Sequence, residues 1–109
     1  MTTVIVENEA CGFRTQITVV RKDRYSVAIV IESDCEAVVR WGKAIGEIDW
    51  RACLGDQPLT SRLWQTAIEI LPHRSCPVLI GTLRAVETAV GLARPAGVRI
   101  RFISPETPP

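Results

Sequence analysis

Apolar and polar positions alternate over the first third of the chain, which predicts strands. Residues 4–6 form a short apolar run that ends at a polar, glycine-containing turn. Residues 15–21 alternate, with Ile17 and Val19 on one face, and residues 25–31 are rich in β-branched side chains. The polar stretch 22–24 suits a hairpin loop between them. The pattern therefore predicts a three-stranded antiparallel meander.

From Ser33 onward the apolar period becomes helical. Ser33 and Glu36 have the spacing of a capping box, and an apolar helical stripe follows at Val38, Trp41, Ile45 and Ile48. Residues 50–59 contain Gly and Pro and predict a helical turn or a loop. Thr60 or Ser61 caps a second helix that Pro72 stops, and Pro77 opens a third helix that runs until residues 94–97 break it.

Residues 98–103 alternate again and predict a closing strand. Val98, Ile100 and Phe102 would point inward, and Arg99 and Arg101 outward. The expected fold is α+β: a meander, then helices packed on one face of a mixed sheet, with the returning fourth strand parallel to the first and third. We expect one domain over residues 1–103 and a flexible, Pro-rich tail over 104–109.

Composition narrows the functional classes. The chain has 109 residues, 47% of them apolar, which fits one domain with a real core. A net charge of +1 offers no electrostatic footprint for nucleic acid. The start of the chain has no basic and apolar leader, and no apolar run approaches the roughly 18 residues of a membrane span. We therefore expect a cytoplasmic protein that engages neither nucleic acid nor membranes.

Four cysteines carry the candidate chemistry: Cys11, Cys35, Cys53 and Cys76. In a cytoplasmic chain, metal or redox roles are better interpretations than a disulfide framework. No Cys-x-x-Cys motif is present, so any site must be assembled by the fold. Following strand and helix directions through the predicted topology brings Cys11, Cys35, Cys76 and His73 to one end of the molecule. Cys53 falls at the other end.

The predicted positions favour thiolate chemistry. Cys35 and Cys76 lie at the starts of helices, where free N–H groups and the helix dipole are expected to lower a thiol pKa. Three thiolates and one imidazole can bind zinc or an iron–sulfur cluster. The candidate metal ligands are Cys11, Cys35, Cys76 and His73, and the residues expected to support them are Ser33, Asp34, Arg74 and Ser75.

The same residues resemble a known family. Ala10-Cys11-Gly12, Cys35 after the third strand, and His73 with Cys76 before the last long helix are similar to the iron–sulfur cluster assembly scaffolds of the NifU/IscU type. The resemblance implies a transiently held cluster, with Cys11, Cys35 and Cys76 as ligands, His73 as a fourth, and cluster donor or acceptor proteins as partners. The chain departs from that pattern at Phe13, where the scaffolds carry Asp.

Three short pieces of the chain also resemble small uncharacterised proteins of anaerobic microbes. They are Cys-Gly-Phe, Ser-Asp-Cys and Pro-His-x-x-Cys-Pro. That resemblance implies a family without an assigned function.

Two other functional classes stay open. One is a thiol redox or nucleophilic enzyme, with Cys35 as nucleophile and His73 as its base. The other is a structural or interaction module with inert thiols, because free cysteines often serve as small buried apolar residues. No hydrolase or transferase constellation has a fixed order in the sequence, so a binding protein is favoured over an enzyme. The sequence leaves the oligomeric state and the identity of the metal open.

Overall fold

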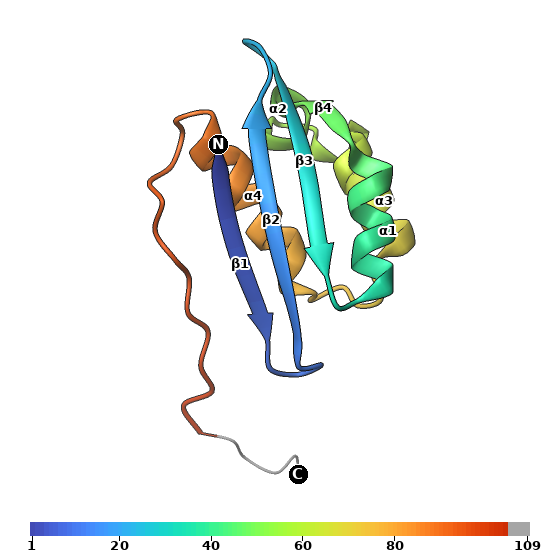
Figure 1. Cartoon of the computed structure of the whole chain (residues 1–109), viewed down its shortest axis with the longest axis vertical. Helices are drawn as coiled ribbons and strands as arrows, with labels where there is room; N and C mark the ends of the chain where they lie inside the picture. The colour runs from blue at the N-terminus through green and yellow to red at the C-terminus, as the bar shows by residue number, and fades with distance from the viewer. Residues whose placement is uncertain (105–109) are drawn as a thin grey trace.

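A four-stranded antiparallel sheet forms one layer of the protein. The computed structural model describes residues 1–104, and its strand order is β1-β2-β3-β4 (Figure 1). The strands span β1 Thr2–Asn8, β2 Phe13–Arg21, β3 Ser26–Ser33 and β4 Glu47–Asp49. The first three are the predicted meander, in which Val4 pairs with Ile17 and Ile17 pairs with Ile31. The α+β class is therefore confirmed.

Helices cover one face of this sheet (Figure 1). They span α1 Glu36–Ile45, α2 Trp50–Leu54, α3 Arg62–Ile70 and α4 Pro77–Ala89, with a 3₁₀ turn, η1, at Pro58–Thr60. Ser61 caps α3, since its hydroxyl accepts from the Trp64 amide at 3.3 Å. Pro77 occupies the start of α4, where a missing N–H costs nothing. Both helix starts match the sequence prediction, but α4 ends at Ala89, before the predicted break at residues 94–97. Among the described residues, no helix combines the length and apolar character needed to cross a membrane.

The core lies between the sheet and the helices. Ile17, Val19, Val27 and Ile29 face inward from the strands, as strand alternation requires. Trp41 on α1 is fully buried, and its indole N–H donates to the Leu63 carbonyl at 3.2 Å. This bond satisfies the one polar atom of a large buried side chain and ties α1 to α3.

Helix α4 approaches the sheet very closely. A Cβ atom added at Gly81 would lie 2.5 Å from a methyl carbon of Val6 on β1. The buried residues of α4 include Thr82 and Ala85, which have small side chains. The predicted stripe of Leu79, Leu83, Val86 and Val90 is only partly right: Val86 is buried, and the other three are partly buried beside the core. Small residues face the sheet because they permit this short separation.

The predicted strand over residues 98–103 is wrong. These residues have no strand assignment, and Ile100 and Phe102 are almost fully exposed. The fourth strand is instead β4, which pairs antiparallel with β3, so the sheet is not mixed. Gly46 ends α1 at φ +58°, a conformation that favours glycine. The predicted place of Ile48 on the helical stripe is therefore wrong, because Ile48 lies after this break and enters the core from β4. Residues 105–109 of the predicted tail lie outside the described part of the chain.

Candidate metal centre

Three connections meet at one end of the molecule (Figure 1). The β1–β2 turn carries Cys11, the β3–α1 connection carries Cys35, and the α3–α4 connection carries His73 and Cys76. Cys53 lies in α2, at the opposite end. The antiparallel meander and the directions of α1, α3 and α4 produce this arrangement, which is the one that the topological argument predicted.

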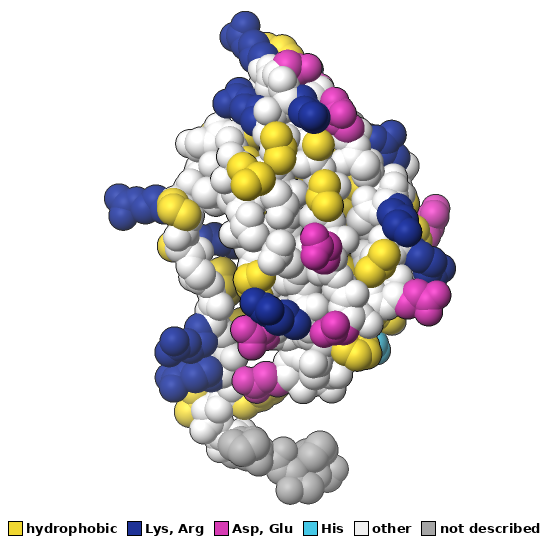
Figure 2. Space-filling view, viewed as in Figure 1, with side chains coloured by type: hydrophobic (Ala, Val, Ile, Leu, Met, Phe, Trp, Pro, Cys, Tyr) yellow, Lys and Arg dark blue, Asp and Glu magenta, His cyan; other side chains and the backbone are white. Residues whose placement is uncertain are grey.

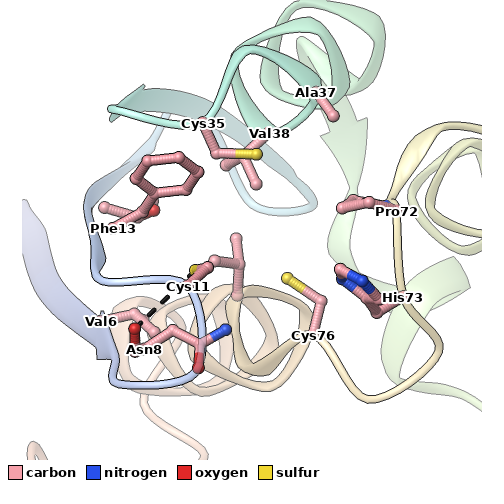
Figure 3. A pocket seen from close by; sticks show the side chains of 12 residues that line it. Val6, Asn8, Cys11, Phe13, Cys35, Ala37, Val38, Pro72, His73 and Cys76 are labelled. Carbon is pink, nitrogen blue, oxygen red and sulfur yellow. Dashed lines mark hydrogen bonds between the residues drawn. The ribbon is translucent and has the colours of Figure 1, made fainter.

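All four predicted ligands line one cavity of about 220 Å³. Cys35, Cys76 and His73 extend into the same space from two different connections, and Phe13 and Pro72 stand at its sides (Figure 3). The remaining wall is contributed by β1, β2 and the first turns of α1 and α4: Val6, Asn8, Thr15, Ala37, Val38 and Val78. The cavity therefore combines soft donors with a largely apolar wall.

Cys11 belongs to a tight turn. Gly12 has a φ of +74°, which L side chains rarely adopt, and its amide donates to the Asn8 carbonyl at 2.8 Å. The Cys11 thiol is exposed and points to the same carbonyl, with Sγ 3.7 Å from the oxygen. This thiol–carbonyl contact is weak, so rotation of the Cys11 side chain toward the cavity costs little.

Cys35 is the residue that precedes α1, and Ser33 fixes it there. The Ser33 hydroxyl accepts from the Cys35 amide at 3.1 Å and lies 2.7 Å from the Thr15 hydroxyl on β2. The predicted capping box is wrong, because α1 starts at Glu36, one residue after Cys35, and has no side-chain cap. Ser33 orients the cysteine backbone rather than the Glu36 amide.

Asp34 joins the Cys35 segment to the Cys11 turn. Its carboxylate accepts from the Arg14 amide at 3.2 Å, and its own amide donates to the Arg14 carbonyl, also at 3.2 Å. Arg14 lies three residues after Cys11. Asp34 therefore holds two of the three cysteine-bearing segments in register with each other.

Cys76 immediately precedes α4, and its amide donates to the His73 carbonyl at 3.3 Å. Burial raises the pKa of the Cys76 thiol, and the neighbouring thiols of Cys35 and Cys11 add to the increase. The predicted lowering of this pKa by the helix start is wrong, because desolvation outweighs the helix effect. The dependence on Cys35 and Cys11 is consistent with three thiols grouped around one cavity.

The other predicted residues of the α3–α4 connection differ in position. His73 is exposed at the cavity margin. The Arg74 guanidinium donates to the Ile68 carbonyl at the end of α3, at 3.0 Å, and so stabilises the connection. Ser75 is exposed, and its side chain makes no hydrogen bond to another residue of the described part of the chain. Of Arg74 and Ser75, it is therefore Arg74 that stabilises the α3–α4 connection through its side chain.

Cys53 differs from the other three thiols. It is 2% exposed, and its thiol lies 3.3 Å from the Trp50 carbonyl oxygen. Burial raises its pKa to about 11. A thiol in this environment serves as a small core residue, as the sequence suggested.

The side chains as they stand do not form a closed coordination sphere. Within residues 1–104, no three His, Cys, Asp or Glu side chains are grouped closely enough to hold one metal ion. Sequence reasoning also missed the apolar lining contributed by Phe13, Val38 and Pro72. Only the position of Phe13, two residues after Cys11, offered a signal.

Comparison with known proteins identifies a family. The model for a family of unknown function, DUF6951, matches residues 2–102. No curated protein and no solved structure matches the chain.

Proposed function

The chain belongs to the DUF6951 family, whose function is unknown; from the chemistry of its cysteine cavity we propose that it binds a thiolate-ligated metal centre. Cys11, Cys35 and Cys76 are the proposed ligands, and His73 is available as a fourth. The observation that carries the proposal is the shared cavity lined by all four side chains. Three soft sulfur donors and an imidazole suit zinc and iron–sulfur clusters better than hard cations such as Mg²⁺.

The size of the cavity favours a cluster over a single zinc ion. Its volume of about 220 Å³ exceeds the roughly 150 Å³ of a cavity that holds benzene. A mononuclear zinc site needs every ligand about 2.0–2.3 Å from one point and so occupies little volume. Ligands of a cluster bind different iron atoms and are spaced farther apart. The cavity therefore suits an iron–sulfur cluster as its bound group.

The unequal exposure of the thiols favours transfer over permanent storage. Cys35 and Cys76 are half-buried where α1 and α4 begin, whereas Cys11 is exposed on a turn. An exposed ligand is accessible to a competing thiol of an acceptor protein. The half-buried Cys35 and Cys76 would hold the cluster until that thiol replaces Cys11. This asymmetry supports a role in cluster assembly, with the cluster as cargo and donor or acceptor proteins as partners.

Cysteine substitution tests the ligand set. Cys11→Ser, Cys35→Ser and Cys76→Ser variants, reconstituted with iron and sulfide without oxygen, are each expected to lose most of the bound iron. Cys53→Ala is the matched control, since it removes a thiol at the opposite end of the molecule, and it should retain wild-type iron. Equal losses from all four variants would refute the assignment, as would full retention by the Cys11, Cys35 and Cys76 variants.

A thiol redox or nucleophilic enzyme is the second candidate. One observation favours it: Cys35 and His73 line the same cavity, so an imidazole is available as a base for the thiol. This candidate predicts one hyper-reactive thiol, Cys35, that is alkylated well below pH 8 in metal-free protein. The metal-centre proposal predicts instead that the bound group protects Cys35 and Cys76 from alkylation.

A further inference from the structure

The C-terminal segment 98–103 exposes a row of large apolar side chains. The exposed fractions are 61% for Val98, 84% for Ile100, 90% for Phe102 and 96% for Ile103. Soluble domains rarely leave such a contiguous group in water without a partner. Arg99 and Arg101 alternate with the first three, so the segment retains the pattern of a half-buried strand although it forms none in the isolated chain.

Strand β1 supplies a matching unpaired edge. It bonds to β2 on one side, and among residues 1–104 no strand pairs with its other side. Val4 and Val6, on the helix-covered face of β1, are only partly buried and pack against the core beside this edge. An open edge of this kind is a template for strand addition.

The two surfaces are complementary in polarity and charge. If a strand with the pattern of residues 98–103 is added to β1, Ile100 and its apolar neighbours continue the row of Val4 and Val6 beside α4. Arg99 and Arg101 then fall on the open face, where the exposed Glu7 lies. On the face shown in Figure 2, Lys or Arg side chains lie close to Asp or Glu side chains toward the lower end of the molecule.

Residues 90–97 connect α4 to the segment 98–103. Arg84 on α4 donates to the Ala96 carbonyl at 3.0 Å, which anchors the chain beside α4 just before the segment begins. Gly91, whose φ is +82°, and Gly97 lie on either side of this anchor, and glycine can adopt backbone conformations that other residues rarely adopt. Beyond it the segment runs along the outer side of β1 and then past its end (Figure 1), and within residues 1–104 it pairs with no strand of its own sheet.

We propose that residues 98–103 add as a strand to the β1 edge of a second copy of this chain, so that two copies exchange segments in a closed dimer. A second copy can cover both surfaces at once, because each copy supplies one segment and one edge, and within residues 1–104 the segment leaves the β1 edge of its own chain unpaired. The exchange is reciprocal and leaves no unpaired β1 edge or exposed apolar row in either copy. This inference does not rest on the proposed function.

Light scattering coupled to size-exclusion chromatography tests the proposal on the full chain. The wild-type protein is expected to elute at twice the 12.0 kDa chain mass. Ile100→Lys should raise the dimer dissociation constant by about a hundredfold or more, because each copy loses one central apolar contact. Val30→Lys is the matched control on the open face of β3, where Val30 is also exposed, and it should leave the dimer intact.

A charge-reversal pair adds specificity to the test. Glu7→Arg alone should weaken the dimer, and combining it with Arg99→Glu and Arg101→Glu should restore most of the loss. Circular dichroism verifies that each variant is folded. A wild-type monomer at all accessible concentrations would overturn the proposal, and so would a dimer that Ile100→Lys leaves unchanged.

Discussion

At the residue scale, environment separates four cysteines that look equivalent in the sequence. Cys11 is exposed on a glycine turn, Cys35 and Cys76 are half-buried next to helix starts, and Cys53 lies in the core. The sequence predicted this grouping because short connections fix strand and helix directions. It did not predict the raised pKa of the Cys76 thiol, because desolvation depends on how tightly neighbouring segments close over the cavity.

The buried thiol of Cys53 predicts a loss of stability in alkaline solution. Its pKa is raised from 9.0 to about 11, so the folded state favours the protonated thiol more strongly than the unfolded state does. The stabilisation is complete below pH 9 and is lost as the pH rises toward 11. We expect urea unfolding to show a decline in stability over this interval, with a smaller decline in Cys53→Ala. An identical pH profile for the two proteins would contradict the assignment.

Asp34 is expected to position two of the proposed metal ligands, Cys11 and Cys35. Asp34→Ala removes the acceptor that holds the Arg14 amide, which releases the Cys11 turn from the Cys35 segment. Metal affinity is expected to fall by about tenfold, as is typical when a group that orients ligands is removed. Asp34→Asn keeps a side-chain oxygen as acceptor and should restore most of the affinity. If both variants bind metal like the wild type in a competitive chelator titration, Asp34 has no such role.

At the element scale, hydrophobic period predicted the three-stranded meander and the three longer helices but misplaced the fourth strand. Residues 98–103 have strand alternation, yet they leave the body beside α4 without meeting an edge in the isolated chain. β4 has only three residues, which are too few to show an alternation of apolar and polar positions in the sequence. The pairing of Ile48 with Val27 depends instead on the tertiary fold. Local pattern therefore identified long elements, whereas pairing partners depended on the whole fold.

The close approach of α4 to β1 predicts that Gly81 cannot be enlarged. In Gly81→Ala the new methyl carbon would meet Val6 at 2.5 Å, which forces α4 away from the sheet. We expect a loss of about 1–3 kcal/mol in the free energy of unfolding, measured in urea. Gly97→Ala is the matched control, because nothing lies within 4 Å of its added Cβ. Wild-type stability in Gly81→Ala would show that α4 does not pack as described.

At the scale of the whole molecule, the fold places the candidate ligands Cys11, Cys35, Cys76 and His73 at one end and the buried Cys53 at the other. Three connections that are distant in sequence supply the cavity, and each is positioned by a rigid strand or helix on either side. The sequence predicted which thiols meet, through topology. It did not predict the size of the cavity or its apolar wall, because both depend on how Phe13, Val38 and Pro72 pack against one another.

The proposed iron–sulfur cluster in the cysteine cavity can be tested by measuring iron and acid-labile sulfide, with a visible absorption spectrum, on protein purified without oxygen. We expect iron and sulfide in comparable amounts and charge-transfer bands that disappear in Cys35→Ser. Colourless protein that takes up neither iron with sulfide nor zinc would contradict it, and zinc alone would contradict the cluster while retaining a thiolate metal site.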